Sequence, residues 1–433
     1  MRQAATLQAG SLVGNFPQAL ISIFIARLLQ PERFGVFSLA MSLAALLSIF
    51  LTSGAQDAIS SLLGASYAKK DHFEISQILA FFIKITFLTG TVSLIGAFLA
   101  PQIAGVFYGN KTIGLYASLV VVAAIISTTL FSLSTVTLQI AGKIKTMMAL
   151  GVADQFLRWG ISLALVFLGF GIWGAVAGQL LGAALIFLIS WFVWQKLKNE
   201  LAIFPSLKSL WQKLKSVSLK KYLGFSVWTA VDRNVANLYL LLPVVLAGVY
   251  LRTAEVTYFK LAFGYFNLAL SLLGPISVLL NVEFPKMKVE NRENLSKNFV
   301  KVSLYSVILS TIVTGGIVLL APFVFKTLYG QSFLPGVPLA RGLLVYGALF
   351  GIGVGLGPMW RAINRVKTSI LINTIVLGVG IPLGLFLLKH FGSWGAVAMV
   401  TLWVTVSHFI SFLYLARLLR KESVFKHSTQ EML

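Results

Sequence analysis

One eight-residue phrase occurs twice in the chain and determines how the rest can be divided. Residues 170–177 read FGIWGAVA and residues 391–398 read FGSWGAVA, with seven identities in eight positions at an offset of 221 residues. Other pairs recur at offsets of 221 or 222: Ala100-Pro101 with Ala321-Pro322, Tyr108-Gly109 with Tyr329-Gly330, and Lys145-Thr146 with Lys367-Thr368. This spacing predicts a tandem duplication, so function depends on two similar halves.

The composition predicts a membrane protein. Hydrophobic residues make up 58% of the chain, charged residues 11%, and the mean hydropathy is +0.88. A soluble globular chain carries roughly 25% charged residues. Windows of about 20 apolar residues recur along the whole length, each long enough to cross a bilayer core of about 30 Å. We therefore expect an all-α polytopic fold. With no cysteine and four scattered histidines, we expect neither a metal site nor thiol chemistry.

Twelve transmembrane spans fit the hydropathy, six in each half. They are roughly 5–28, 34–55, 79–100, 114–139, 147–169 and 172–195, then 222–248, 254–281, 299–325, 336–360, 366–388 and 394–418. We interpret the N-terminal stretch as the first span rather than a cleaved signal, because no clear cleavage site precedes it.

The basic residues predict the orientation. If the N-terminus is cytoplasmic, 24 of the 35 Lys and Arg residues lie in cytoplasmic segments, 6 in outer loops and five within spans. This asymmetry predicts that both termini are cytoplasmic. It also accounts for the net charge of +22 without a nucleic-acid partner.

An even number of spans per repeat predicts two lobes that insert in the same direction, related by an axis along the membrane normal. The expected domains are an N-lobe (1–195), a cytoplasmic linker (196–221) and a C-lobe (222–433) that ends in a short basic tail. After Pro205 the linker has apolar residues at helical spacing among lysines. We expect it to be an amphipathic interfacial helix on the anionic leaflet.

Several of these residues match a known family. They are the duplicated P-x(6)-YG ends of the third and ninth spans, ARLLQPERFGVFSLA at 26–40, VEFPKM at 282–287, and the FGxWGAVA pair. The chain resembles the polysaccharide or O-antigen type flippases of lipid-linked oligosaccharides, within the multidrug/oligosaccharidyl-lipid/polysaccharide exporter superfamily. The resemblance covers essentially the whole chain, although the related lipid II flippases usually carry two further spans.

The resemblance implies a V-shaped alternating-access transporter with a central cavity between two six-helix lobes. It implies a polyprenyl-pyrophosphate-linked oligosaccharide as substrate, flipped to the outer leaflet of the bacterial cytoplasmic (inner) membrane for surface polysaccharide assembly. We expect membrane lipids as further partners, a polysaccharide polymerase as an additional partner, and a monomer. The family has no universal catalytic signature, so candidate site residues come from position and chemistry.

Charges near the membrane midplane are the first candidates for the cavity. Asp232 and Arg233 lie about 15 Å into the seventh span, at 1.5 Å per residue. Arg158 lies at a similar depth in the fifth span, with Asp154 one turn earlier on the same face. Charges there face the protein interior or a wet cavity. Both pairs have an alternative role as buried ion pairs that hold helices together. None of the four residues recurs in the other half, which favours a cavity role.

Five further residues complete the candidates. Lys260 either extends a cationic track outward or reaches the headgroups, and Asn237 lies one turn after Arg233 and suits sugar hydroxyls. Asp57 lies at the cytoplasmic mouth or is a solvated end charge, and Arg361 either binds pyrophosphate or sets topology. Pro358, within GIGVGLGPMW, marks a hinge or a close helix contact. Arginine suits pyrophosphate because its planar fork stays charged.

Three other functions compete with flipping a lipid-linked oligosaccharide. A multidrug or other cation or lipid exporter uses the same fold, but the candidate charges are three cations against two anions. An enzyme is not expected, because the outer loops are too short for a catalytic site, and a purely structural scaffold would retain costly charges without use. We expect no cofactor. With no ATP-binding motif, a proton or sodium gradient or a downhill substrate supplies the energy.

Overall fold

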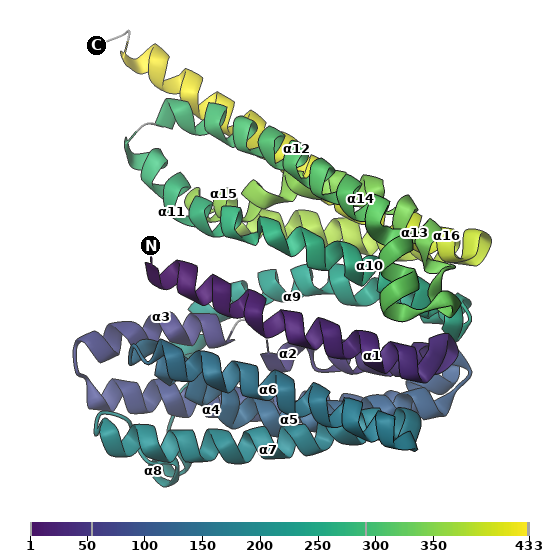
Figure 1. The fold of residues 1–433 in the computed structure, drawn as a ribbon. Coiled ribbons are helices and arrows are strands. Elements are labelled where there is room, and N and C mark those ends of the chain that lie inside the picture. Colours follow the sequence, from purple (N-terminus) through teal and green to yellow (C-terminus); the bar gives the residue numbers. More distant parts are fainter. Residues whose placement is uncertain (1, 53–54, 291, 431–433) are drawn as a thin grey trace. The chain divides into compact units, whose positions relative to one another are not determined.

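All secondary-structure elements described in the computed structural model are helices (Figure 1). The structure describes residues 2–52, 55–290 and 292–430, with the side chains of 18–51, 59–60, 62–222, 228, 230–289 and 294–420. The contacts divide the chain into two compact units, Met1–Val249 and Tyr250–Leu433. They place the seventh span in the first unit, whereas the C-lobe is expected to begin with it at residue 222. The division into lobes stays a prediction.

The first unit is a bundle of long helices. The helices α4 and α5, α6 and α7, and α5 and α7 pack closely, and α1 lies against α5 and α6. The bounds are α1 (Arg2–Leu47), α2 (Ile49–Thr52), α3 (Ala55–Ala68), α4 (His72–Tyr108), α5 (Lys111–Ile140), α6 (Ile144–Leu165), η1 (Val166–Phe170), α7 (Gly171–Glu200), α8 (Leu207–Lys213) and α9 (Leu219–Tyr250).

The second unit has shorter, more broken helices. Its main contacts join α12 to α14 and η5, α11 to α15, and α10 to α13. The bounds are α10 (Thr253–Leu270), η2 (Ser271–Leu273), α11 (Gly274–Glu290), α12 (Arg292–Val324), η3 (Phe325–Tyr329), η4 (Gln331–Phe333), α13 (Gly336–Gly342), α14 (Leu344–Phe350), η5 (Gly351–Gly355), α15 (Leu356–Ala362) and α16 (Val366–Gln430).

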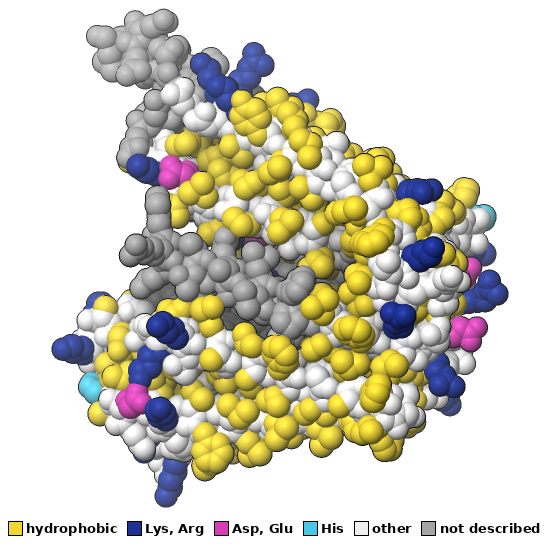
Figure 2. Space-filling model, in the orientation of Figure 1, with side chains coloured by type: hydrophobic (Ala, Val, Ile, Leu, Met, Phe, Trp, Pro, Cys, Tyr) yellow, Lys and Arg dark blue, Asp and Glu magenta, His cyan; other side chains and the backbone are white. Residues whose placement is uncertain are grey.

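The helices cross a membrane, as expected. Seven described stretches are long and apolar enough to do so, or eight if the bent pair in the tenth span counts as one. Two of these stretches, Ile144–Glu200 and Val366–Arg420, hold 57 and 55 residues, enough for two spans each. On the visible face hydrophobic side chains cover the middle of the helices, and Lys and Arg side chains lie towards the helix ends (Figure 2).

Non-helical residues divide these long stretches where span boundaries are predicted. Gly171 and Gly392 interrupt the two double-length stretches, and Gln30 (φ 62°, ψ 165°) interrupts α1 between the first two spans. With these breaks, the helices account for all twelve predicted spans over the residues that the structure describes. The all-α, twelve-span prediction is confirmed.

The repeated phrase forms the same reversal in both halves. Gly171 has φ 56° and ψ −138°, and Gly392 has φ 55° and ψ −132°. Residues with a Cβ rarely adopt this region, which explains the glycine in each copy. Three residues later, a Cβ on Gly174 would lie 2.9 Å from the carbonyl carbon of Leu165, and one on Gly395 would lie 2.1 Å from the carbonyl oxygen of Leu387. The phrase is therefore a tight helix reversal.

The hairpin of α6 and α7 is closed by small residues on α7. A Cβ built on Gly178 would lie 2.3 Å from Cα of Ser162, and one on Gly182 would lie 2.5 Å from Cα of Arg158. The two backbones therefore touch, as in the small-xxx-small packing of membrane helices. Gln179 adds a polar contact, since its Nε2 donates to Oγ of Ser162 at 3.2 Å.

The matching hairpin within α16 places its small residues on the opposite helix. Here the glycines are Gly380 and Gly384, at offset 222 from Arg158 and Ser162, and the large side chains come from the later segment. A Cβ on Gly380 would lie 2.6 Å from Nε1 of Trp403, and one on Gly384 would lie 2.5 Å from Sδ of Met399. Trp403 Nε1 donates to the Gly380 carbonyl at 2.8 Å. In the first hairpin the glycines lie on the later helix, and in the second they lie on the earlier segment. We call this reversal the exchange of bulk between the repeats.

The linker contains a short helix, α8, that packs against α4. Leu210 and Val217, two of the linker's apolar residues after Pro205, are only 0% and 2% exposed and belong to the core of the first unit. Lys84 Nζ of α4 donates to the Val217 carbonyl at 3.0 Å. The linker differs from the expected interfacial helix in this respect, because part of its apolar face is buried by protein.

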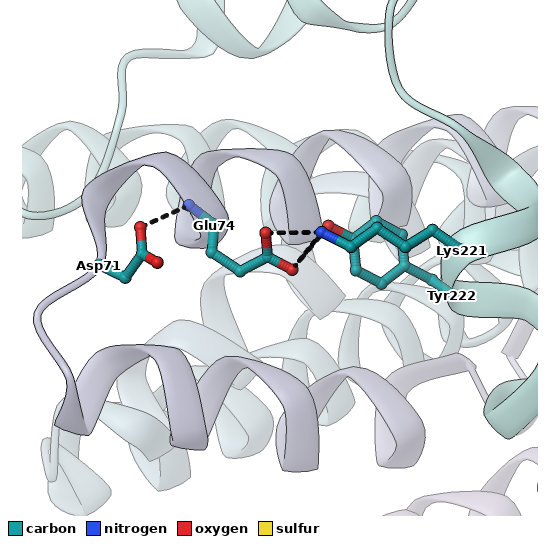
Figure 3. A network of polar contacts seen from close by, with 4 residues as sticks. All are labelled: Asp71, Glu74, Lys221 and Tyr222. Carbon is teal, nitrogen blue, oxygen red and sulfur yellow. Dashed lines mark hydrogen bonds and ion pairs between the residues drawn. The ribbon is translucent and has the colours of Figure 1, made fainter.

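A polar network fixes the end of the linker to the start of α4 (Figure 3). Lys221 Nζ donates to both carboxylate oxygens of Glu74 at 2.8 Å, and Tyr222 OH donates to Oε1 at 2.8 Å. The hydrogen bonds to Glu74 raise the pKa of Lys221 above its ordinary value of 10.5, and contact with Tyr222 adds to this. Asp71 caps α4, since its Oδ1 accepts from the Glu74 amide at 2.9 Å. The first turns of α4 and α9 are therefore joined.

Candidate functional site

The candidate residues of the seventh span lie on α9. Arg233 is exposed, and Ala236 and Leu240 continue the same exposed face at spacings of three and seven. Asp232 and Asn237 are half-buried on either side of this face. An exposed charge in an apolar span would cost a few kcal/mol against hydrocarbon. Physical chemistry therefore favours a wet, polar environment for this face of α9.

The far end of α9 is held by the repeated Tyr-Gly pair. Tyr108 OH, at the end of α4, donates to the Val245 carbonyl at 3.2 Å. Pro243 lies two residues before Val245 within α9. Proline has no amide hydrogen, so one backbone hydrogen bond of the helix is missing at this point. The hydroxyl thus ties α4 to α9 next to the interruption, and together with the contacts of Glu74 it fixes α9 at both ends.

The predicted pair on α6 forms. Arg158 Nη2 is ion-paired with Oδ2 of Asp154, whose side chain is 5% exposed, against 24% for Arg158. The pair lies at the seam with α7, where Gly182 makes room for the Arg158 backbone. Asp154 Oδ1 and Arg158 Nε have no hydrogen-bond partner among the described residues.

The packing gives a physical reason why Arg158 does not recur in the second half. Gly380 takes its place there, and the space is filled by Trp403 from the other side of the hairpin. The absence of a second arginine thus follows from the exchange of bulk and does not require a cavity role. The seam favours the alternative in which Asp154 and Arg158 hold helices together, and their role in a cavity remains a prediction.

In the second unit, Lys260 lies on the polar face of α10. Lys260 is partly exposed, and Gly264, Asn267 and Ser271 follow it at spacings of four, seven and eleven, all of them exposed or half-buried. Asn267 is held in place, because Tyr346 OH donates to its Oδ1 at 2.6 Å. This face is the least apolar surface of α10. Arg361 lies elsewhere in the unit, exposed in the last turn of α15.

The tenth span is irregular at two places. A bend of 41° separates Gly336–Gly342 from Leu344–Ala362, and the 3-10 segment η5 lies just before the buried Pro358. Pro358 cannot donate to the carbonyl of Val354 within η5, which accounts for the local change of helix type. Such a mid-helix 3-10 segment is typical of hinges, so Pro358 stays a hinge candidate. Asp57 lies outside the side chains that the structure describes.

The structure adds contacts that sequence reasoning missed. The Glu74 network joins residues 147 and 148 positions apart, and the bond from Tyr108 spans 137 positions. The one available signal was chemical, since Glu74 is among only 13 acidic residues in a chain with 35 basic ones.

Comparison with known proteins agrees with this architecture. The family described as "Polysaccharide biosynthesis protein" matches residues 24–338, more than half of the chain. No match to a curated protein sequence was found.

Among solved structures, an inward-facing multidrug resistance MATE family transporter of the MOP superfamily is similar with a TM-score of 0.73 and 17% identity, covering 93% of this chain and 95% of that one. The lipid II flippase MurJ, in an inward closed conformation, is similar with a TM-score of 0.68 and 17% identity, covering 93% and 86%. A eukaryotic MATE transporter, AtDTX14, gives 0.67 and 14%, covering 96% and 97%. At such identities the likeness shows the fold. The chain is a multi-pass membrane protein, and the family match shows that it belongs to the polysaccharide biosynthesis protein family.

Proposed function

We propose that this protein is a flippase that moves a polyprenyl-pyrophosphate-linked oligosaccharide from the cytoplasmic to the outer leaflet, by alternating access, for surface polysaccharide assembly. The family membership and the fold shared with MATE transporters and MurJ both support a membrane transporter or flippase. The proposed location is the bacterial cytoplasmic membrane with both termini inside, on the asymmetry of basic residues.

The observation that carries the proposal is the exposure of Arg233 on α9. A guanidinium stays ionised in a cavity and binds phosphate oxygens through two parallel N–H donors. Asn237 follows one turn later and offers an amide to sugar hydroxyls. In a pyrophosphate-linked oligosaccharide, the phosphates would bind the charged Arg233 and the attached sugars would bind the neutral Asn237.

The charges also weigh against the second candidate, export of cationic drugs. The candidate residues are the cations Arg158, Arg233 and Lys260 against Asp154 and Asp232. A cavity for cations would need the opposite balance, because like charges repel the ligand. Proposed partners are the lipid-linked substrate, membrane lipids and a polysaccharide polymerase, with the protein acting as a monomer. We propose transport without an enzymatic activity.

The test is complementation of a strain that lacks the gene, scored by surface polysaccharide. Loss of a charge-assisted hydrogen bond costs about 1.5–3 kcal/mol, so Arg233→Ala is expected to lower export roughly 10- to 100-fold. Arg233→Lys is expected to retain part of the activity. Arg27→Ala is the matched control, because Arg27 is an exposed arginine three residues before the break at Gln30.

All variants must reach the membrane in equal amounts for the comparison to hold. Normal export by Arg233→Ala would remove this residue from the mechanism. A changed drug-resistance profile on deletion, with unchanged polysaccharide, would instead favour the drug exporter.

A further inference from the structure

The lysines of the linker differ in whether they make contacts within the protein. Lys213 Nζ donates to Oγ of Ser76 at 2.8 Å and lies over the ring of Phe73, and Lys221 binds Glu74. Lys208 and Lys215 are exposed and form no ion pair with a described residue. Lys208 and Lys215 therefore remain available to a ligand outside the protein.

Trp211 lies between these two lysines and faces outward. The spacings from Lys208 are three to Trp211 and seven to Lys215, and Leu214 keeps right-handed helical geometry between them. Within α8 the spacing places Lys208 and Trp211 on one face, and Lys215 follows in the turn after the helix. Trp211 is 63% exposed, while Leu210 beside it is fully buried. The exposed side of α8 and of the turn that follows it thus carries two cations around an indole.

This face is continuous with the lipid-facing surface of α4. The Trp211 ring packs edge-on against Phe87 at 5.5 Å between centroids. Phe87 is 45% exposed and starts a row of exposed apolar residues along α4, Leu88, Val92 and Ile95, that has the spacing of a helix surface in contact with acyl chains. The border between hydrocarbon and headgroups therefore passes beside Trp211.

We propose that Lys208, Trp211 and Lys215 form a docking surface for an anionic phospholipid headgroup in the leaflet at this end of α4. The two ammonium groups bind the headgroup phosphate, and the indole lies at the level of the glycerol, as amphipathic aromatic residues do at membrane interfaces. Charge complementarity favours a lipid over a basic protein partner. Residues 196–221 hold seven lysines and one acid, Glu200, which is already paired with Lys143.

The experiment measures lipid binding by the full chain in mild detergent. Phosphatidylglycerol and phosphatidylcholine with the same acyl chains are titrated separately, and binding is followed by native mass spectrometry and by the shift in melting temperature. The test variant is Lys208→Gln/Lys215→Gln. The matched control, Lys69→Gln/Lys70→Gln, removes two exposed lysines from the turn before α4, at the same end of the unit. Trp211→Ala tests the indole by itself.

The test variant is expected to bind phosphatidylglycerol about 30-fold more weakly, since each lysine near an anionic surface contributes about one factor of five. The control is expected to bind it as the unmodified protein does, and phosphatidylcholine is expected to bind all of them weakly. Equal losses in test and control variants would overturn the proposal, because they would show general attraction to net charge. Unchanged binding by the test variant would overturn it as well.

Discussion

A backbone-to-backbone helix contact in the first unit gives the sharpest prediction. Gly182 of α7 faces α6 so closely that an alanine Cβ would lie 2.5 Å from Cα and 2.7 Å from the backbone nitrogen of Arg158. Both neighbours are backbone atoms, so no side chain can rotate to make room. The matched control is Gly160→Ala on α6 in the same hairpin, where a Cβ would meet nothing within 4 Å.

The magnitude follows from the distances. Ordinary contact begins at 3.4 Å, so α6 and α7 must separate by about 0.9 Å to accept the methyl group. Overpacking of this kind typically costs about 1–3 kcal/mol, and a gap of this width forfeits a quarter to a half of the dispersion energy across the seam. Gly160→Ala introduces no clash and gains up to about 1 kcal/mol of helix propensity. Gly182→Ala gains the same propensity within α7, so that gain cancels, and the two variants should differ by the overpacking cost of about 1–3 kcal/mol.

The assay is thermal unfolding of purified protein in one detergent, followed by intrinsic fluorescence. At about 2 °C per kcal/mol for a unit of this size, Gly182→Ala is expected to melt at least about 2 °C below Gly160→Ala. The refuting result is equal melting temperatures for the two variants, which would mean that the backbones of α6 and α7 do not touch.

Four further outcomes are expected. Arg158→Gln alone should destabilise by about 3 kcal/mol, because it leaves the buried Asp154 unpaired, and Asp154→Asn should cost less, because Arg158 is partly exposed. The double variant should cost less than the sum, and additive losses in the same melting assay would show that the pair is not coupled. Glu74→Ala should speed tryptic cleavage within residues 196–221 several-fold by releasing Lys221, and an unchanged cleavage rate would argue against the network. Because Glu74 raises the pKa of Lys221, protection by this pair should persist through neutral pH and disappear only as pH rises past that elevated value. Gln30→Gly should raise the melting temperature, since glycine adopts φ 62°, ψ 165° without a strain of about 1 kcal/mol, and a lower value would contradict strain at this residue.

The positions of the spans could be predicted because they depend on hydropathy and on glycine. The predicted boundary between the fifth and sixth spans, at 169–172, contains the observed turn at Gly171. The helix lengths could not be predicted in the same way. The predicted third span begins at 79, but α4 begins at His72, because Asp71 caps a helix that continues beyond the apolar stretch. Hydropathy carries no signal for such an extension.

In the candidate site, too, a contact within one helix could be predicted, and contacts between helices could not. Pairing of Asp154 with Arg158 was predictable, because it depends only on a spacing of four within one helix. The exchange of bulk at Gly182 and Trp403 was not, because it depends on which faces of two helices meet. The same holds for Glu74, whose partners follow it by 147 and 148 residues. Sequence periodicity assigns residues to a face of a helix, and only tertiary structure assigns that face to a neighbour.

The tight reversals at Gly171 and Gly392 also bear on how the protein is made. Each joins two helices with almost no intervening loop, so almost no polar backbone has to pass through the bilayer when the pair inserts. We therefore expect each pair to enter the membrane as a preformed hairpin. In the first hairpin, Asp154 already neutralises Arg158 within the same helix, and Gln179 already binds Ser162 across the pair. The translocation machinery would then receive two spans whose charged and polar groups are matched before they meet lipid.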